Sequence, residues 1–152
     1  MNFSELGLRP ALLRRCESLG YTEPTPIQER AIPVVLTGAD LIGCAETGTG
    51  KTAAFLLPTL QRMAETKRPG VRVLVLAPTR ELVSQIHESY KQLAPKGSPR
   101  CAAVIGGASP ILCIVGRRKA AVLPVPVSAQ PMRSAPVSTT GIARSWMVVG
   151  FS

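Results

Sequence analysis

The sequence predicts an α/β fold, in which a parallel sheet lies between helices, followed by an irregular tail. Apolar runs of strand length alternate with segments of helical periodicity between residues 40 and 105. Strands joined by helices run parallel, because a right-handed crossover returns the chain to the sheet in the same direction. Residues 110–152 differ, since they contain five prolines, no acidic residue and no helical stripe. We therefore expect a folded domain over residues 1–109 and a basic, Pro-rich, poorly ordered segment over residues 110–152.

Two helices are expected before the first strand. Apolar residues recur at helical spacing over residues 10–19. In the second helix Thr25 is a good N-cap, Pro26 fits the first helical position, and Gln28 can reach back to the N-cap backbone as in a capping box. Pro33 is expected to kink or restart this second helix.

A phosphate-binding loop is indicated after the first strand, Asp40–Cys44. Residues 45–52 match the pattern GxxxxGK followed by Ser or Thr, with Ala45 at the first glycine position. The glycines let backbone N–H groups surround an anion, towards which the positive end of the next helix also points. Lys51 would reach the outer phosphates, and Thr52 would offer its hydroxyl to Mg²⁺. The alternative is an ordinary glycine-rich turn that carries a surface lysine.

Two more strands and one more helix follow. Val71–Ala77 is apolar almost throughout, which predicts a strand that is buried on both faces. Residues 80–93 are predicted as a helix, and Cys101–Ile105 as the third strand. The loops after the three strands would share one edge of a parallel sheet, where ligands bind in such folds. These loops are residues 45–52, 78–80 and 106–107.

Charge and cysteine content restrict the class of protein. The chain carries 18 Lys and Arg residues against 9 Asp and Glu residues, which favours an anionic partner such as nucleic acid. The four cysteines lack CxxC spacing and only one histidine is present, which argues against zinc. Cys16 and Cys44 are expected to be core thiols, as in a reducing compartment. Without a leader or a membrane-length apolar run, the sequence predicts a cytoplasmic protein with no membrane contact and no disulfide-linked partner.

Four groups of residues follow one another between residues 3 and 109: Phe3 with Gly20–Gln28, then Ala45–Thr52, Pro78–Leu82 and Gly106-Gly107. In this order they resemble the motifs of the DEAD-box ATP-dependent RNA helicases. A phosphate loop alone indicates only an NTPase, whereas the combination is specific to the family. The resemblance implies part of a RecA-like P-loop NTPase domain, with ATP and Mg²⁺ as cofactors and RNA as a partner held by its backbone with little sequence specificity. The motifs are Phe3 with the Q motif Gly20–Gln28; motif I, made of Ala45, Glu46, Thr47, Gly48, Thr49, Gly50, Lys51 and Thr52; motif Ia, Pro78–Leu82; and the pair Gly106-Gly107.

The resemblance places the nucleotide against the Q motif and motif I. Gln28 could both donate to and accept from the adenine edge, as Gln does on DNA adenines, although the capping role competes for the same side chain. Tyr21, supported by Phe3, would stack on the base; the alternative is that both are ordinary core aromatics. Residues 45–52 would bind the phosphates.

The resemblance also implies an RNA contact at motif Ia and the glycine pair. Pro78, Thr79 and Arg80 follow a strand and open a helix, so backbone N–H groups and a guanidinium would converge on a phosphate. Gly106 and Gly107 would let the RNA backbone approach closely. The alternatives are that Thr79 caps the helix while Arg80 forms a surface salt bridge, and that the glycines form a plain turn.

The sequence departs from the family after Ser109. Asp40 is the only aspartate and no acidic residue follows Glu88, so the carboxylates that hold Mg²⁺ and orient the attacking water are missing. We expect a truncated or frame-shifted product. By family it would be an ATP-hydrolysing RNA helicase, but this chain alone is expected to be inactive.

Four interpretations of function stay open at this point. The chain is the front portion of an RNA-stimulated ATPase that unwinds duplexes, or a non-catalytic module that binds nucleotide and RNA. It could instead be a P-loop kinase or another NTPase with a coincidental Q motif. Finally, exposed strand edges could prevent it from folding stably.

Overall fold

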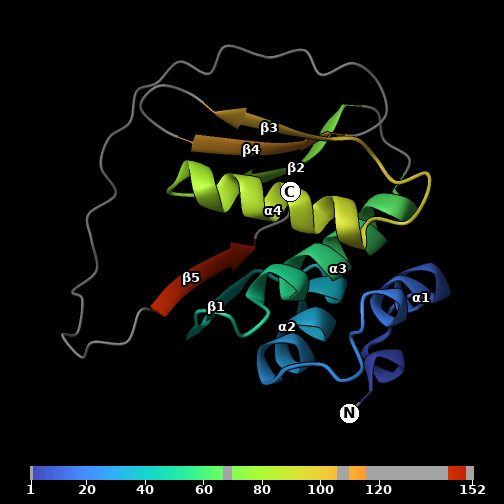
Figure 1. Cartoon of the computed structure of the whole chain (residues 1–152). Coiled ribbons are helices and arrows are strands. Elements are labelled where there is room, and N and C mark those ends of the chain that lie inside the picture. Colours follow the sequence, from blue (N-terminus) through green and yellow to red (C-terminus); the bar gives the residue numbers. More distant parts are fainter. Residues whose placement is uncertain (1, 67–69, 106–109, 116–143, 150–152) are drawn as a thin grey trace.

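The computed structural model in Figure 1 describes residues 2–66, 70–105, 110–115 and 144–149. Helices and strands alternate through the described part, which confirms the predicted α/β class. The elements are the 3-10 helix η1 Phe3–Leu6, α1 Pro10–Ser18, α2 Pro26–Thr37, β1 Leu41–Glu46, α3 Lys51–Glu65, β2 Val71–Leu76, α4 Arg80–Leu93, β3 Cys101–Ile105, β4 Pro110–Val115 and β5 Arg144–Val149.

The strands form two small sheets instead of the single parallel sheet that was predicted. β1 pairs with β5, and β4 lies between β2 and β3. All of these pairings are antiparallel. β2 and β3 therefore point in the same direction, but β4 lies between them. β4 starts five residues after β3 ends, which is too short for a crossover and long enough for a hairpin. The prediction failed because strands from the tail, which the sequence pattern did not assign, pair with β1, β2 and β3.

The tail therefore contributes more regular structure than its sequence suggests. Residues 110–115 and 144–149 form β4 and β5, in a region predicted to be irregular. The boundary proposed at residue 109, and the rest of the tail, lie outside the described residues.

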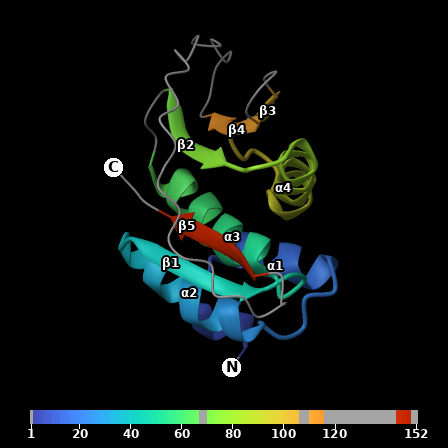
Figure 2. The same ribbon diagram turned by 90° about the vertical axis from the view of Figure 1, so that its left-hand side faces the viewer.

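The helices occupy distinct places around the two sheets. In Figures 1 and 2, α4 lies against the β2–β4–β3 sheet, α2 lies next to β1, and α3 lies between α2 and α4. α2 continues through Pro33 and ends at Gly38, which takes a φ of +87°. In the described ranges, every helix is too short or too polar to cross a bilayer.

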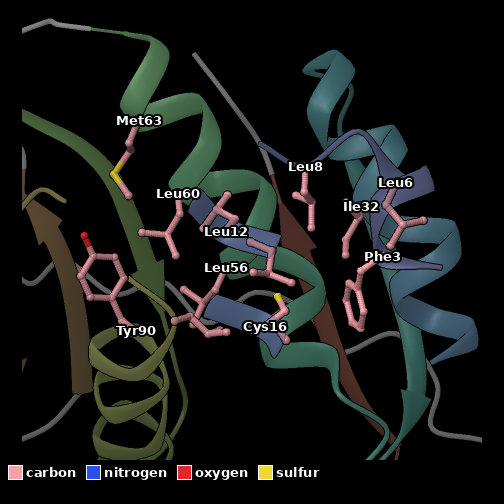
Figure 3. Close-up of a cluster of buried hydrophobic side chains, with 13 residues drawn as sticks. Phe3, Leu6, Leu8, Leu12, Cys16, Ile32, Leu56, Leu60, Met63 and Tyr90 are labelled. Atoms are coloured by element: carbon pink, nitrogen blue, oxygen red, sulfur yellow. The ribbon is translucent and has the colours of Figure 1, made fainter. Parts of the chain in front are cut away.

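The main hydrophobic core lies between helices and the N-terminal segment (Figure 3). Helix α3 supplies five apolar side chains, and α1 and α4 pack against it. Tyr90 of helix α4 also belongs to this core. The buried members are Phe3, Leu6, Leu8, Leu12, Cys16, Ile32, Ala53, Leu56, Leu57, Leu60, Met63, Tyr90 and Leu93.

One face of the strands is more exposed than the sequence predicts. β2 was expected to be buried on both faces, but Leu74 is 58% exposed and Leu76 is 66% exposed. On β1, Ile42 is 69% exposed, and Cys44, predicted as a core thiol, is exposed as well. The apolar run has two apolar faces, but helices within the described residues cover only one of them.

The two cysteines Cys16 and Cys44 should react very differently with iodoacetamide. Cys16 is 1% exposed, and burial raises the pKa of its thiol to about 11. At pH 8 only about one in a thousand of its thiols is then the nucleophilic thiolate. We expect Cys44 to be alkylated at least about tenfold faster, as measured by site-resolved mass spectrometry. In denaturant the two rates should converge; similar rates in the native chain would contradict this packing.

Candidate functional site

The predicted phosphate loop lies between β1 and α3, as the sequence indicates. β1 extends through Glu46, and α3 begins at Lys51, so the loop is shorter than the motif. Gly48 has a φ of +85° and Gly50 a φ of +83°, a region that favours glycine. At Gly50 a Cβ would also lie 2.4 Å from Nε2 of Gln28. Two independent constraints therefore require glycine at position 50.

Lys51 is folded back over its own loop. Its ammonium Nζ donates to the carbonyl oxygen of Ala45 at 2.7 Å and to that of Glu46. The hydroxyl of Thr49 also donates to the Glu46 carbonyl, at 2.7 Å. Lys51 thus lies at the loop, and its predicted contact with phosphates stays a prediction.

The start of α2 is tied directly to the loop. The Thr25 hydroxyl donates to the carbonyl of Thr49 at 2.8 Å, and the Gln28 amide nitrogen donates to that of Gly50 at 3.1 Å. The Gln28 oxygen accepts from the backbone N–H of Thr25 at 3.0 Å, which confirms the predicted capping contact. Gln28 is only 4% exposed, so its two ends are held by protein partners. The contact with adenine stays a prediction.

The two predicted aromatic residues pack on each other but differ in exposure. Phe3 is 6% exposed and belongs to the main core, whereas Tyr21 is 36% exposed. Their rings stack with centroids 6.2 Å apart and planes inclined by 26°. Phe3 is therefore a core aromatic that supports the more exposed ring of Tyr21, and the stacking of Tyr21 on a base stays a prediction.

The second set of predicted residues opens helix α4. Thr79 is the N-cap, and its hydroxyl accepts a hydrogen bond from the backbone N–H of Leu82 at 3.2 Å. Pro78 and Arg80 are exposed beside it. The capping alternative is therefore confirmed for Thr79. The positive end of the α4 dipole lies at the same residues, next to the exposed Arg80.

Two predicted relations are not observed. β1 and β2 belong to different sheets, so the phosphate loop and residues 78–80 do not lie on one sheet edge. The cause is the absence of a direct β1–β2 pairing. Gly106 and Gly107 lie outside the described residues, and their predicted RNA contact stays a prediction.

Sequence reasoning missed the long-range role of Thr25. Thr25 is the predicted N-cap, and its hydroxyl also donates to a carbonyl 24 residues away. The only available signal was its place next to Gln28 and upstream of a phosphate loop.

Comparisons with known proteins agree on one family. The family model described as DEAD/DEAH box helicase matches residues 25–119, ten residues beyond the end of the expected likeness. DEAD-box ATP-dependent RNA helicase 28 of Oryza sativa is 53% identical over 71% of this chain and 14% of its own length. ATP-dependent rRNA helicase rrp3 of Aspergillus terreus is 55% identical over 69% of this chain and 23% of its own.

Solved structures place the chain in the same group. The RNA helicase Prp28 of Chaetomium thermophilum, solved with ADP, is 50% identical with a TM-score of 0.64, over 71% of this chain and 27% of its own. Dbp5 of S. cerevisiae, solved with RNA and ADP BeF3, is 40% identical with a TM-score of 0.55, over 60% of this chain and 24% of its own. The chain thus spans about a seventh to a quarter of the length of these proteins. It belongs to the DEAD/DEAH box helicase family, and its domain is RecA-like.

Proposed function

We propose that this chain binds an adenine nucleotide and the backbone of RNA, as the front part of an ATP-dependent RNA helicase. The observation that carries the proposal is the phosphate loop, with two glycines at positive φ and Lys51 at its centre. Relatives named as ATP-dependent RNA helicases, and neighbours solved with ADP or RNA, support it.

The loop fits a nucleoside phosphate. A Cβ at Gly48 would meet nothing within 4 Å, so that side of the loop is open to a ligand. The ammonium of Lys51 already binds oxygen atoms, and phosphate oxygens would replace the carbonyls of residues 45 and 46. Thr52, in the first turn of α3, would hold Mg²⁺. When bound, this ion would offset the negative charge of the phosphates.

The adenine would lie at Tyr21 and Gln28. Tyr21 offers an exposed ring that Phe3 supports from the core, which suits stacking on a base. An amide has two N–H donors and an acceptor oxygen with two lone pairs, and Gln28 uses one of each within the protein. It therefore keeps one donor and one acceptor site with which to read an adenine edge.

RNA would bind at the beginning of α4. Helix N-termini attract phosphates, and the Arg80 guanidinium is exposed beside this one. Because these groups address the backbone, we expect little dependence on RNA sequence.

A second interpretation is that the 152 residues bind nucleotide without hydrolysing it. No acidic residue follows Glu88. Within the described residues no three His, Cys, Asp or Glu side chains gather to hold a metal ion. Phosphoryl transfer needs carboxylates at the metal and at the attacking water.

Free thiols at Cys16 and Cys44 fit a reducing compartment, such as the cytoplasm.

Substitution of Lys51 should separate this proposal from a plain turn. We expect Lys51→Ala to weaken ADP binding at least about tenfold, because a charge-assisted hydrogen bond contributes about 1.5–3 kcal/mol. Isothermal titration calorimetry would measure the affinity. Lys91→Ala is the matched control, since Lys91 pairs with Glu88 on the surface. Equal ADP binding by the wild type and Lys51→Ala would refute the nucleotide site.

Hydrolysis can be tested on the same samples. We expect no phosphate release above background from ATP with Mg²⁺, with or without RNA, because the required carboxylates are missing. A coupled phosphate assay would measure it. Turnover that RNA stimulates and that Lys51→Ala abolishes would overturn the non-catalytic interpretation and support the first.

RNA binding should depend on Arg80. We expect Arg80→Ala to weaken binding of single-stranded RNA uniformly across sequences, and to reduce the slope of log affinity against log salt by about 1. Fluorescence anisotropy at several salt concentrations would measure both. Arg14, exposed on α1, provides the control substitution Arg14→Ala. An unchanged slope in Arg80→Ala would argue against a phosphate contact there.

A further inference from the structure

Gln61 clamps the N-terminal segment to helix α3. Its side-chain oxygen accepts from the backbone N–H of Arg9 at 2.9 Å, and its amide nitrogen donates to the carbonyl of Gly7 at 3.1 Å. The two bonds connect residues more than fifty positions apart in the chain. Both ends of one side chain thus hold the short link between η1 and α1.

The link that Gln61 holds controls where η1 lies. Gly7 ends η1 with a φ of +77°, and the chain turns there towards α1. η1 carries Phe3, whose ring stacks on Tyr21. A fixed path from Gly7 to Arg9 therefore keeps the supporting ring beneath the exposed one.

Helix α3 joins the two ends of the proposed nucleotide site. It starts at Lys51, at the phosphate loop, and carries Gln61 ten residues later. An α-helix is rigid at a rise of about 1.5 Å per residue, so these two points keep a constant separation. The same helix thus anchors the phosphate end directly and the aromatic end through Gln61.

We propose that Gln61 is a positioning residue for adenine recognition, which acts through η1 on Phe3 and Tyr21. This inference rests on the proposed function, because it concerns the base-binding end of the same site. A purely structural clamp would affect stability alone. A positioning residue affects ligands that carry a base and leaves ligands that consist of phosphate unaffected.

The test compares ADP with pyrophosphate on Gln61→Ala and Gln61→Glu. Glutamate keeps an acceptor for the N–H of Arg9 but cannot donate to the carbonyl of Gly7. We expect Gln61→Ala to weaken ADP binding about threefold to tenfold, with Gln61→Glu between it and the wild type. Pyrophosphate affinity should stay the same in all three. Gln85→Ala, an exposed glutamine on α4, is the matched control.

The outcomes separate this inference from the function on which it rests. Equal losses for ADP and pyrophosphate, or no loss for ADP, would show that Gln61 does not position the base and would overturn the inference. Wild-type binding of ADP no tighter than pyrophosphate would refute the adenine site, and the inference with it. Amide hydrogen exchange at Arg9 confirms in each sample whether the clamp was broken, so an intact fold with unchanged ADP affinity is decisive.

Discussion

The fold around the candidate site depends on one set of contacts, between the start of α2 and the carbonyls of the phosphate loop. Buried polar groups must find partners, and the nearly buried Gln28 finds them in Thr25 and Gly50. Gly50 in turn has no space for a Cβ, because the amide of Gln28 occupies it. Loop conformation and the place of α2 are therefore set together. A change on either side disturbs both, so the start of α2 and the loop share one rigid geometry.

Electrostatics make this region favourable for an anion. α3 begins directly at Lys51, and α4 begins at Arg80, so each helix presents its positive end beside a cationic side chain. At the start of α3 the ammonium of Lys51 donates hydrogen bonds to two loop carbonyls. These bonds lower the free-energy cost of holding the charge in a half-buried position. A phosphate would compete with these carbonyls for the ammonium. It would displace them because it carries a negative charge and can also accept hydrogen bonds from backbone N–H groups.

The apolar side chains of the core are buried, whereas several apolar side chains of the strands are exposed. Helix α3 is surrounded by apolar side chains from the N-terminal segment, α1 and α4, as Figure 3 shows. By contrast, Leu74 and Leu76 on β2 and Ile42 on β1 expose most of their surface. Among the residues whose burial is described, the buried apolar side chains lie mainly on the helices and the N-terminal segment, so helices rather than a large central sheet form the core beside the phosphate loop.

The sequence by itself determined the local features of the chain. The starts of α2 and α4 and the strand–loop–helix unit depend on capping and periodicity within a few residues, and they appear where predicted. Tertiary structure alone decided the rest. The antiparallel pairing with β4 and β5 depends on which edges meet, while the ties of Thr25, Gln28 and Gln61 join residues 22 to 54 positions apart. No local pattern encodes such contacts, because their energy exists only after the helices have packed.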